Sequence, residues 1–264
     1  MHRNPLTLYQ RCLQNVLLRL RPAPLGSSLK GALGLGRTVV KTPHGKFWVD
    51  PFSNLGAEIS RHGSYESGMR KVIEKYLSPG AVFFDLGANE GYFTVIGARR
   101  CGTSGRVVAV EPQERLLPII AENLHLNGVE GVSVLNIAVT DSNAAAAIHL
   151  TADMNTGASG LFKSVKYELP TQQVATKTLV RVLDDEGLTY VDLMKVDIEG
   201  FEYEALLGSK EVFEQRRVRA LALELHPTIL AAREKRVADI TQMLAACDYE
   251  MANAFGNSVW LAPA

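Results

Sequence analysis

Acidic side chains stand near the ends of three short apolar runs in this sequence. The first run leads into Asp85 and Glu90 within the glycine-rich stretch DLGANEGYF, and the second run, VVAV, ends in Glu111. A third run, LMKV, leads into Asp197 and Glu199. Carboxylates accept hydrogen bonds from sugar hydroxyls, face cations and take up protons. If the three runs end at one edge of a sheet, the sequence predicts a binding site with several carboxylates.

The order of the apolar runs predicts an α/β fold. Short apolar runs bounded by turns alternate with helical segments, a pattern typical of a parallel sheet covered by helices on both faces. The last two runs, YEMANAFG and NSVWLAP, follow one another without a helix, so we expect them to form an antiparallel pair. We therefore expect a Rossmann-like, doubly wound, mostly parallel seven-stranded sheet with an antiparallel edge strand. Such sheets bind ligands at the carboxyl ends of strands, where the winding reverses.

We expect two parts of the chain. Residues 61–264 form the main domain, which begins with an amphipathic helix over residues 64–77 and contains a long helix over residues 228–247. Residues 1–60 form an extension with a helix and, over residues 37–50, a hairpin. Its first fifty residues hold eight Lys or Arg against a single acid. This basic segment could lie on a membrane surface, but we favour a helix docked on the domain or on a second subunit, which would form a homo-oligomer.

The overall composition excludes several classes of protein. The 264 residues carry a formal net charge of +0, so nothing global indicates a nucleic acid as a partner. No apolar run reaches the roughly 18 residues of a membrane span, and the N-terminus lacks the pattern of a secretory signal, so we expect a cytoplasmic protein. The three scattered cysteines argue against a disulfide framework and against a zinc site.

The glycine-rich stretch predicts a nucleoside cofactor that carries positive charge. Gly87 and Gly91 allow a sharp turn before a helix, and Glu111 can accept hydrogen bonds from both hydroxyls of a ribose. A dinucleotide would bring its diphosphate to Asp85 and Glu90, and like charges ~4 Å apart cost on the order of 4 kcal/mol near a surface. S-adenosylmethionine instead offers an ammonium and a sulfonium, which these acids would favour.

Several motifs together resemble a known family. The stretches DLGANEGYF, AVEP, AENLHLNGV, LNIAV and LMKVDIEGFEYEALLG are similar to those of class I S-adenosylmethionine-dependent methyltransferases of the FkbM type, over roughly residues 64–226. The resemblance implies that S-adenosylmethionine is the cofactor. It also implies a set of cofactor-binding residues: Glu66, Asp85, Gly87, Ala88, Asn89, Gly91, Tyr92, Phe93, Glu111, Pro112, Asn136, Ala138 and Asp197. Within that set the turn borders the methionine part, Glu111 binds the ribose, and residues 136–138 line the adenine.

The candidate catalytic residues lie at the ends of the predicted strands YVDLMKVDI and VRALALELH. A hydroxyl acceptor must lose a proton, and Asp197 is our first choice for the group that borders the methyl or orients the acceptor, with Glu199 next. Lys195 shares the face of these acids, either as a catalytic group or in a salt bridge with Asp197. The neighbouring strand end adds Glu224 and His226, an imidazole able to accept a proton. These acids could also hold a divalent metal ion, but no specific metal motif is present, and we lean toward none.

The long segment over residues 141–180 predicts a lid. We expect its stretches AAIHL and VATKTLV to extend the sheet or form a hairpin, and MNTGASGLF to arch over the cofactor. Asn155 and Ser159 would then contact the acceptor, although a solvent-exposed loop is an equal alternative.

The leading hypothesis is an S-adenosylmethionine-dependent methyltransferase that acts on a hydroxyl of a sugar, polyketide or similar small metabolite, as the resemblance implies. N-methylation by the same architecture remains an alternative. A second hypothesis is an NAD-dependent oxidoreductase on a Rossmann sheet, which the missing third glycine and the adverse acids disfavour. A third is a non-catalytic scaffold subunit that retains the cofactor-binding fold.

Overall fold

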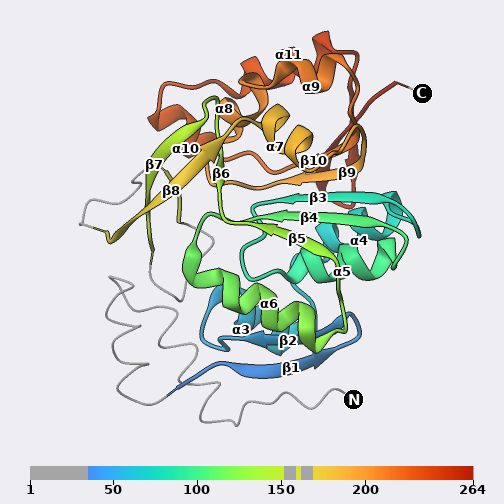
Figure 1. Cartoon of the computed structure of the whole chain (residues 1–264), viewed down its shortest axis with the longest axis vertical. Coiled ribbons are helices and arrows are strands. Elements are labelled where there is room, and N and C mark those ends of the chain that lie inside the picture. Colours follow the sequence, from blue (N-terminus) through green and yellow to red (C-terminus); the bar gives the residue numbers. More distant parts are fainter. Residues whose placement is uncertain (1–34, 152–158, 162–168, 264) are drawn as a thin grey trace.

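The structure is a computed structural model that describes residues 35–151, 159–161 and 169–263. Its centre is a seven-stranded sheet (Figure 1). The strands are, in spatial order, β11 (Glu250–Ala254), β12 (Asn257–Leu261), β10 (Val218–Leu223), β9 (Val191–Val196), β3 (Val82–Leu86), β4 (Arg106–Val110) and β5 (Val132–Leu135).

The winding of this sheet reverses beside β3. From β3 the chain continues outward to β4 and β5, and it later returns to β9 and β10 on the other side of β3. These five strands are parallel, whereas β12 is antiparallel to both β10 and β11. The predicted doubly wound, mostly parallel sheet is therefore confirmed, with the antiparallel strand second from the edge. The carboxyl ends of β3 and β9 flank the point of reversal, where a ligand is expected.

Helices cover both faces of the sheet (Figure 1). One face carries α3 (Asn54–His62), α4 (Ser67–Tyr76), α5 (Tyr92–Cys101) and α6 (Leu117–Leu126), and the other carries α7 (Leu179–Asp185), α8 (Glu202–Leu207), α9 (Lys210–Glu214), α10 (Pro227–Ala232) and α11 (Val237–Ala246). Each face has its own apolar core. Phe83 packs in the first core and the adjacent Phe84 in the second, because successive side chains of a strand point to opposite faces.

The predicted hairpin is confirmed as β1 (Thr38–Thr42) and β2 (Gly45–Val49). It lies against α6, where the Asn123 side chain accepts a hydrogen bond from the backbone N–H of Trp48 at 2.6 Å. Asn127 accepts a second hydrogen bond, from the backbone N–H of Lys46, at 2.9 Å. Phe47 belongs to the core under α4 and α5. The boundary near residue 60 stays a prediction, and the expected N-terminal helix and oligomer contact lie outside the described residues.

A second, three-stranded sheet lies beside the carboxyl ends of the main strands (Figure 1). It contains β6 (Ala138–Val139), β8 (Thr171–Lys177) and β7 (Ala144–His149), with β7 antiparallel to β8. The hairpin predicted within residues 141–180 is thus confirmed. Of the predicted lid, the structure describes residues 159–161, whereas Asn155 lies outside the described residues.

Two predicted elements differ from the structure. The run over residues 132–139 is divided between β5 and β6, so it serves both sheets. The long helix predicted over residues 228–247 is two helices, α10 and α11, because the chain turns at Glu234, whose φ is +57°. Within the described residues, no helix is both long enough and apolar enough to cross a membrane.

Candidate active site

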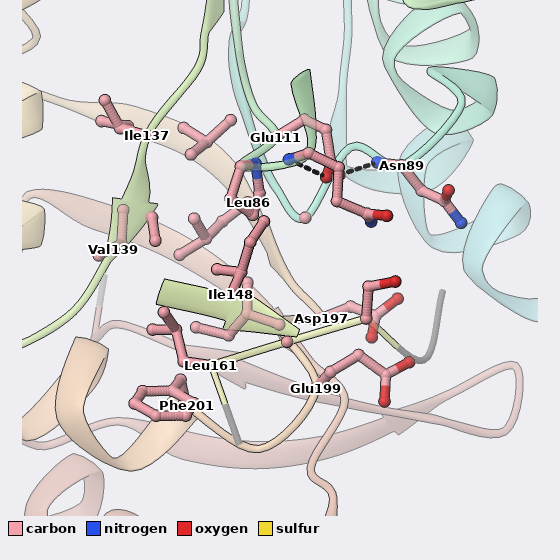
Figure 2. A pocket seen from close by; sticks show the side chains of 18 residues that line it. Leu86, Asn89, Glu111, Ile137, Val139, Ile148, Leu161, Asp197, Glu199 and Phe201 are labelled. Atoms are coloured by element: carbon pink, nitrogen blue, oxygen red, sulfur yellow. Dashed lines mark hydrogen bonds between the residues drawn. The ribbon is translucent and has the colours of Figure 1, made fainter. Parts of the chain in front are cut away.

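A cavity of about 610 Å³ lies at the carboxyl ends of β3, β4 and β9, under the small sheet (Figure 2). One part is polar, with Asn89, Glu111, Asp197 and Glu199. The rest is an apolar slot formed by Leu86, Val110, Ile137, Ala138, Val139, Ile148, Leu161, Ile198 and Phe201.

The glycine turn after β3 forms the floor of the cavity. Gly87 has a φ of +91°, and a Cβ at this position would lie 1.9 Å from the carbonyl oxygen of Asp197. Only glycine allows this approach between the ends of β3 and β9. Two residues later, the backbone N–H of Asn89 donates a hydrogen bond to Oε2 of Glu111 at 2.7 Å. The turn is therefore fixed to both neighbouring strands.

Glu111 follows β4 and lines the cavity with 2% of its surface exposed. Its Oε1 accepts a hydrogen bond from the backbone N–H of Gln113 at 2.9 Å. Burial raises the pKa of Glu111 to about 7, although the N–H donors of Gln113 and Asn89 act in the opposite direction. Asn136 supports this turn through its side-chain amide, which donates to the carbonyl oxygens of Glu111 and Pro112.

Lys195 is a buried cation beneath the glycine turn. Its Nζ donates to the carbonyl oxygen of Gly87 at 3.1 Å and lies 3.4 Å from Oδ2 of Asp197 and 3.6 Å from Oδ1 of Asp85. Burial disfavours its charge, but the carboxylates of Asp197 and Asp85 outweigh burial and raise the pKa of Lys195. Lys195 does not line the cavity, and its ion pairs with Asp197 and Asp85 agree with the salt-bridge alternative.

The two acids of the glycine-rich stretch do not face the cavity. Asp85 is wholly buried, and it accepts a hydrogen bond from Thr94 Oγ1 at 2.6 Å. Glu90 is also wholly buried and accepts two hydrogen bonds from Arg37, at 2.8 and 2.9 Å. Neither acid lines the cavity, because each is paired inside the protein with a cation, Lys195 or Arg37. The expected contact between Asp85 and the cofactor stays a prediction.

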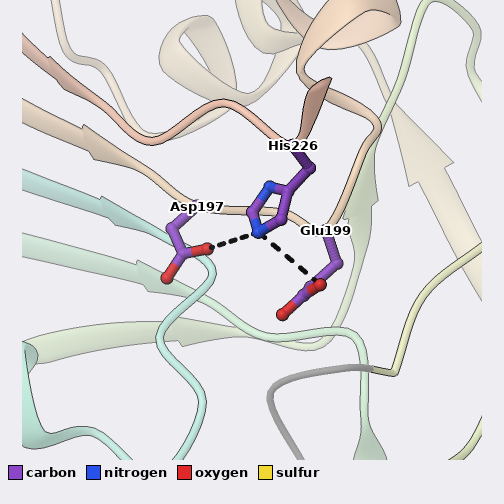
Figure 3. Close-up of side chains that lie close together, drawn as sticks. All are labelled: Asp197, Glu199 and His226. Atoms are coloured by element: carbon purple, nitrogen blue, oxygen red, sulfur yellow. Dashed lines mark ion pairs between the residues drawn. The ribbon is translucent and has the colours of Figure 1, made fainter. Parts of the chain in front are cut away.

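The carboxyl ends of β9 and β10 bring Asp197, Glu199 and His226 together (Figure 3). His226 Nε2 lies 3.8 Å from Oδ1 of Asp197 and 3.6 Å from Oε2 of Glu199. Its other nitrogen, Nδ1, lies 2.7 Å from Oε1 of the buried Glu202. Strand β9 ends before Asp197, and Glu199 has a φ of +52°, so the two acids converge through a turn and not through strand alternation.

Burial and charge shift the pKa values of this group. Burial lowers the pKa of His226, but the hydrogen bond and charge of Glu202, followed by the charges of Glu199 and Asp197, outweigh burial and raise it to about 9. Burial raises the pKa of Glu199 to about 7, while His226 opposes this change. A ring already protonated at neutral pH stabilises the nearby carboxylates and is a poor proton acceptor. The carboxylates are therefore the better candidate bases.

Glu66 and Glu224 line a second, more open hollow of about 1010 Å³. Burial raises the pKa of each of these carboxylates. The phenol of Tyr65 is hydrogen-bonded to Glu66. Glu66 was expected beside the cofactor, but it lies in this hollow and not in the 610 Å³ cavity.

The remaining predicted residues divide into lining and supporting groups. Pro112 and Ala138 line the cavity. Ala88 and Gly91 support the turn, the first by donating its N–H to the carbonyl oxygen of Val110. Tyr92 and Phe93 pack in the core beside Phe47 and Tyr65 and do not line the cavity.

Sequence reasoning missed several functional positions. Of the apolar wall, Ile148 lies outside the quoted motifs and Phe201 lies within LMKVDIEGFEYEALLG but was not selected. Ile137 falls within residues 136–138, which were expected to line the adenine. Glu202 was also missed, and its signal was its position three residues after Glu199, on the first turn of α8.

Comparisons with known proteins match this chain to methyltransferases. Residues 85–251 match a family described as the methyltransferase FkbM domain, which is more than half of the chain. Protein-L-isoaspartate O-methyltransferase 1 of Arabidopsis thaliana is 28% identical over 96 residues, or 36% of this chain and 42% of that protein. The chain therefore matches less than half the length of this relative.

Two solved structures show distant similarity. The methyltransferase FkbM of Methylobacillus flagellatus is 13% identical with a TM-score of 0.45, covering 92% of this chain and 72% of its own. Precorrin-6y C5,15-methyltransferase of Geobacter metallireducens is 15% identical with a TM-score of 0.41, covering 73% of this chain and 77% of its own.

Proposed function

The chain belongs to the FkbM methyltransferase family and uses S-adenosylmethionine as its methyl donor, and from this premise we propose that it methylates a hydroxyl oxygen on a small metabolite such as a sugar or a polyketide. One observation carries the proposal: Glu111 and an apolar slot share a single cavity with Asp197 and Glu199. Glu111 and the apolar slot suit a nucleoside. The carboxylates of Asp197 and Glu199 suit a positively charged sulfonium and can accept the proton of a hydroxyl.

The residues of the cavity fit the cofactor. Each carboxylate oxygen of Glu111 accepts one backbone N–H and retains a second lone pair, which can accept a ribose hydroxyl. The apolar side chains of Ile137, Ile148 and Leu161 would enclose the adenine. The bare backbone of Gly87 leaves room for the methionine part, where Asn89 adds a polar side chain.

S-adenosylmethionine supplies an electrophilic methyl group on a positively charged sulfur. The residues of this chain hold the two reactants in line, and such alignment can lower a barrier by up to ~7–11 kcal/mol. Asp197, which Lys195 holds in place, orients the acceptor hydroxyl and takes up its proton as the oxygen–methyl bond forms. Glu199 is the second candidate for this role. The product ether and the sulfur nucleoside then leave the cavity.

The acceptor would enter through the hollow lined by Glu66 and Glu224. Both carboxylates interact electrostatically with Asp197, which lines the cavity. Acids that accept hydrogen bonds suit an acceptor with several hydroxyls. This arrangement favours a polyhydroxylated acceptor and O-methylation, whereas the NAD-dependent alternative has no support from family membership.

Calorimetry tests the cofactor, and a labelled donor tests the acceptor. The purified chain should bind S-adenosylmethionine and its demethylated product but not NAD. In extracts of small metabolites, label from the donor methyl should appear as an ether on a hydroxylated compound. Label found solely on amines would contradict O-methylation, and cofactor binding without any transfer would favour the scaffold hypothesis.

A further inference from the structure

Three side chains of metal-ligand type meet at the edge of the active-site cavity. Asp197 and Glu199 follow β9, and His226 lies between β10 and α10. One ligand atom from each lies within 4.8 Å of the other two. Figure 3 shows the imidazole pointing between the two carboxylates.

The two nitrogens of His226 have different environments. Nδ1 is in direct contact with Glu202, at 2.7 Å, which is a normal charge-assisted hydrogen bond. Nε2 is 3.6 Å from Glu199 and 3.8 Å from Asp197, too far for a hydrogen bond with either. If the group were a plain imidazolium–carboxylate pair, Nε2 should close on one acid as Nδ1 does. It instead faces a gap between two carboxylates.

The gap has the dimensions of a metal site. Ligand atoms ~2.1–2.2 Å from one ion lie roughly 3.4–3.8 Å apart at angles between tetrahedral and trigonal. The measured separations from Nε2, 3.6 and 3.8 Å, agree with this spacing. The ligand oxygens of Asp197 and Glu199 lie within 4.8 Å of one another.

Glu202 supplies an independent observation. It is wholly buried, its Oε1 also accepts the N–H of Gly200 at 3.0 Å, and its Oε2 has no hydrogen-bond partner among the described residues. A buried carboxylate on the far nitrogen of a histidine is the arrangement that orients metal-bound imidazoles. The unpartnered oxygen marks negative charge that the imidazole alone does not fully compensate, and a cation at Nε2 would balance it.

The excess of negative charge around His226 also favours a bound cation. Asp197, Glu199, Glu202 and Glu224 surround a single imidazole, and the nearby Lys195 is already shared between Asp197 and Asp85. Two carboxylates and one imidazole are a donor set that suits Mn²⁺ or Zn²⁺, and soft metals would prefer thiolates.

We propose that Asp197, Glu199 and His226 bind a divalent metal ion, with Glu202 as the residue that orients the imidazole. Three protein ligands leave coordination positions for an exogenous oxygen. Asp197 and Glu199 line the cavity, so these positions face the reacting centre. Resting on the proposed function, the ion would hold two neighbouring oxygens of the acceptor, such as a vicinal diol, beside Asp197.

Metal binding tests the proposal without any measurement of activity. The full chain is freed of metal with a chelator and titrated with Mn²⁺ by electron paramagnetic resonance, and with Zn²⁺ by calorimetry. We expect one ion per chain. Glu199→Gln, His226→Gln and the orienting variant Glu202→Gln should each weaken binding by at least ~10-fold, within the range known for metal sites. Thermal melting verifies that each variant is folded.

Two matched control variants distinguish metal binding by specific ligands from attraction of the ion by nearby negative charge. Glu224→Gln removes the same charge at the neighbouring strand end, and His125→Gln removes an exposed imidazole on α6. Both should bind the ion within ~3-fold of the parent, because neither is a ligand or orients one. Failure of the parent to bind either ion below millimolar concentration, or an equal loss in Glu224→Gln and Glu199→Gln, would overturn the proposal.

Cofactor binding and methyl transfer, measured on the same protein, distinguish the proposed metal site from the proposed function. Calorimetry with S-adenosylmethionine in the presence of chelator reports the cofactor site alone. Cofactor binding and methyl transfer in a chain that binds neither ion would overturn the metal site and retain the methyltransferase. Specific binding of one ion in a chain that transfers no methyl group to a hydroxyl would support the metal site and contradict O-methylation.

Discussion

Two pairs of carboxylates in this molecule have similar sequence settings and different roles. Asp85, on β3, and Glu90, in the glycine turn that follows, are wholly buried and pair with protein cations. Asp197 and Glu199, after β9, are partly exposed and line the cavity. Each pair lies at the carboxyl end of a buried parallel strand, β3 or β9, beside the point where the winding reverses. The comparison teaches that burial and pairing, and not position in a motif, decide which acids can serve a ligand.

The largest expected effect concerns the pair that lines the cavity. Asp197→Asn should preserve the fold and lower kcat by ~10²–10⁴-fold, because the variant cannot take up the acceptor's proton. Steady-state kinetics with the identified acceptor, together with thermal melting, measures both quantities. An unchanged kcat in the folded variant would remove Asp197 from the reaction and weaken the distinction between the two pairs.

Substitution of Glu90 should lower stability and leave cofactor binding unchanged. Glu90→Gln breaks a buried, two-fold hydrogen-bonded ion pair with Arg37, which is itself slightly exposed, so we expect a loss of ~2–4 kcal/mol in the free energy of unfolding. Urea unfolding measures this loss, and calorimetry should show unchanged affinity for S-adenosylmethionine in the folded variant. The exposed Glu130→Gln is the control and should change stability by no more than ~0.5 kcal/mol. If the Glu90 variant is as stable as this control, the structural role is wrong.

Glu111 combines features of both pairs, because it is buried and yet lines the cavity. Glu111→Ala should weaken binding of S-adenosylmethionine by ~1.5–3 kcal/mol, the range for lost hydrogen bonds to a charged group. Calorimetry of the folded variant measures this change. An affinity equal to that of the parent would exclude Glu111 from the cofactor site.

The smallest effect is a pH dependence from the same residue. The pKa of Glu111 is raised to about 7, so in the free protein the carboxylate forms as pH rises through neutrality. Its charged form accepts ribose hydroxyls better, so affinity for the cofactor should rise by up to ~10-fold between pH 6 and pH 8, in proportion to the deprotonated fraction. Glu111→Gln has no such titration, and its affinity should be flat over this range. A parent with equally flat affinity would contradict this assignment.

The sequence predicted the sheet and the place of the cavity because both depend on local patterns. Apolar runs and turns define the strands. Glycine is required at position 87 because the ends of β3 and β9 come into contact there. The partner of Glu90 could not be predicted, because Arg37 lies 53 residues away, directly before a hairpin that docks through tertiary contacts. Tyr92 and Phe93 follow the glycine turn directly, but the start of α5 directs their side chains into the core.

Tertiary contacts also limit what the sequence predicts at the ends of β9 and β10. Alternating positions at the end of a predicted strand indicated Asp197 and Glu199, but the role of Glu202 depends on its tertiary contact with His226, which no local pattern specifies. His226 was selected as a proton acceptor from the pKa of a free imidazole, whereas its buried carboxylate neighbours raise that pKa to about 9.

A crystal structure of the chain grown with S-adenosylhomocysteine tests the central claim most directly. The account predicts the ribose hydroxyls on Glu111, the adenine in the slot that contains Ile137 and Ile148, and the sulfur directed toward Asp197. A nucleoside bound elsewhere, with this cavity filled by protein side chains, would contradict it.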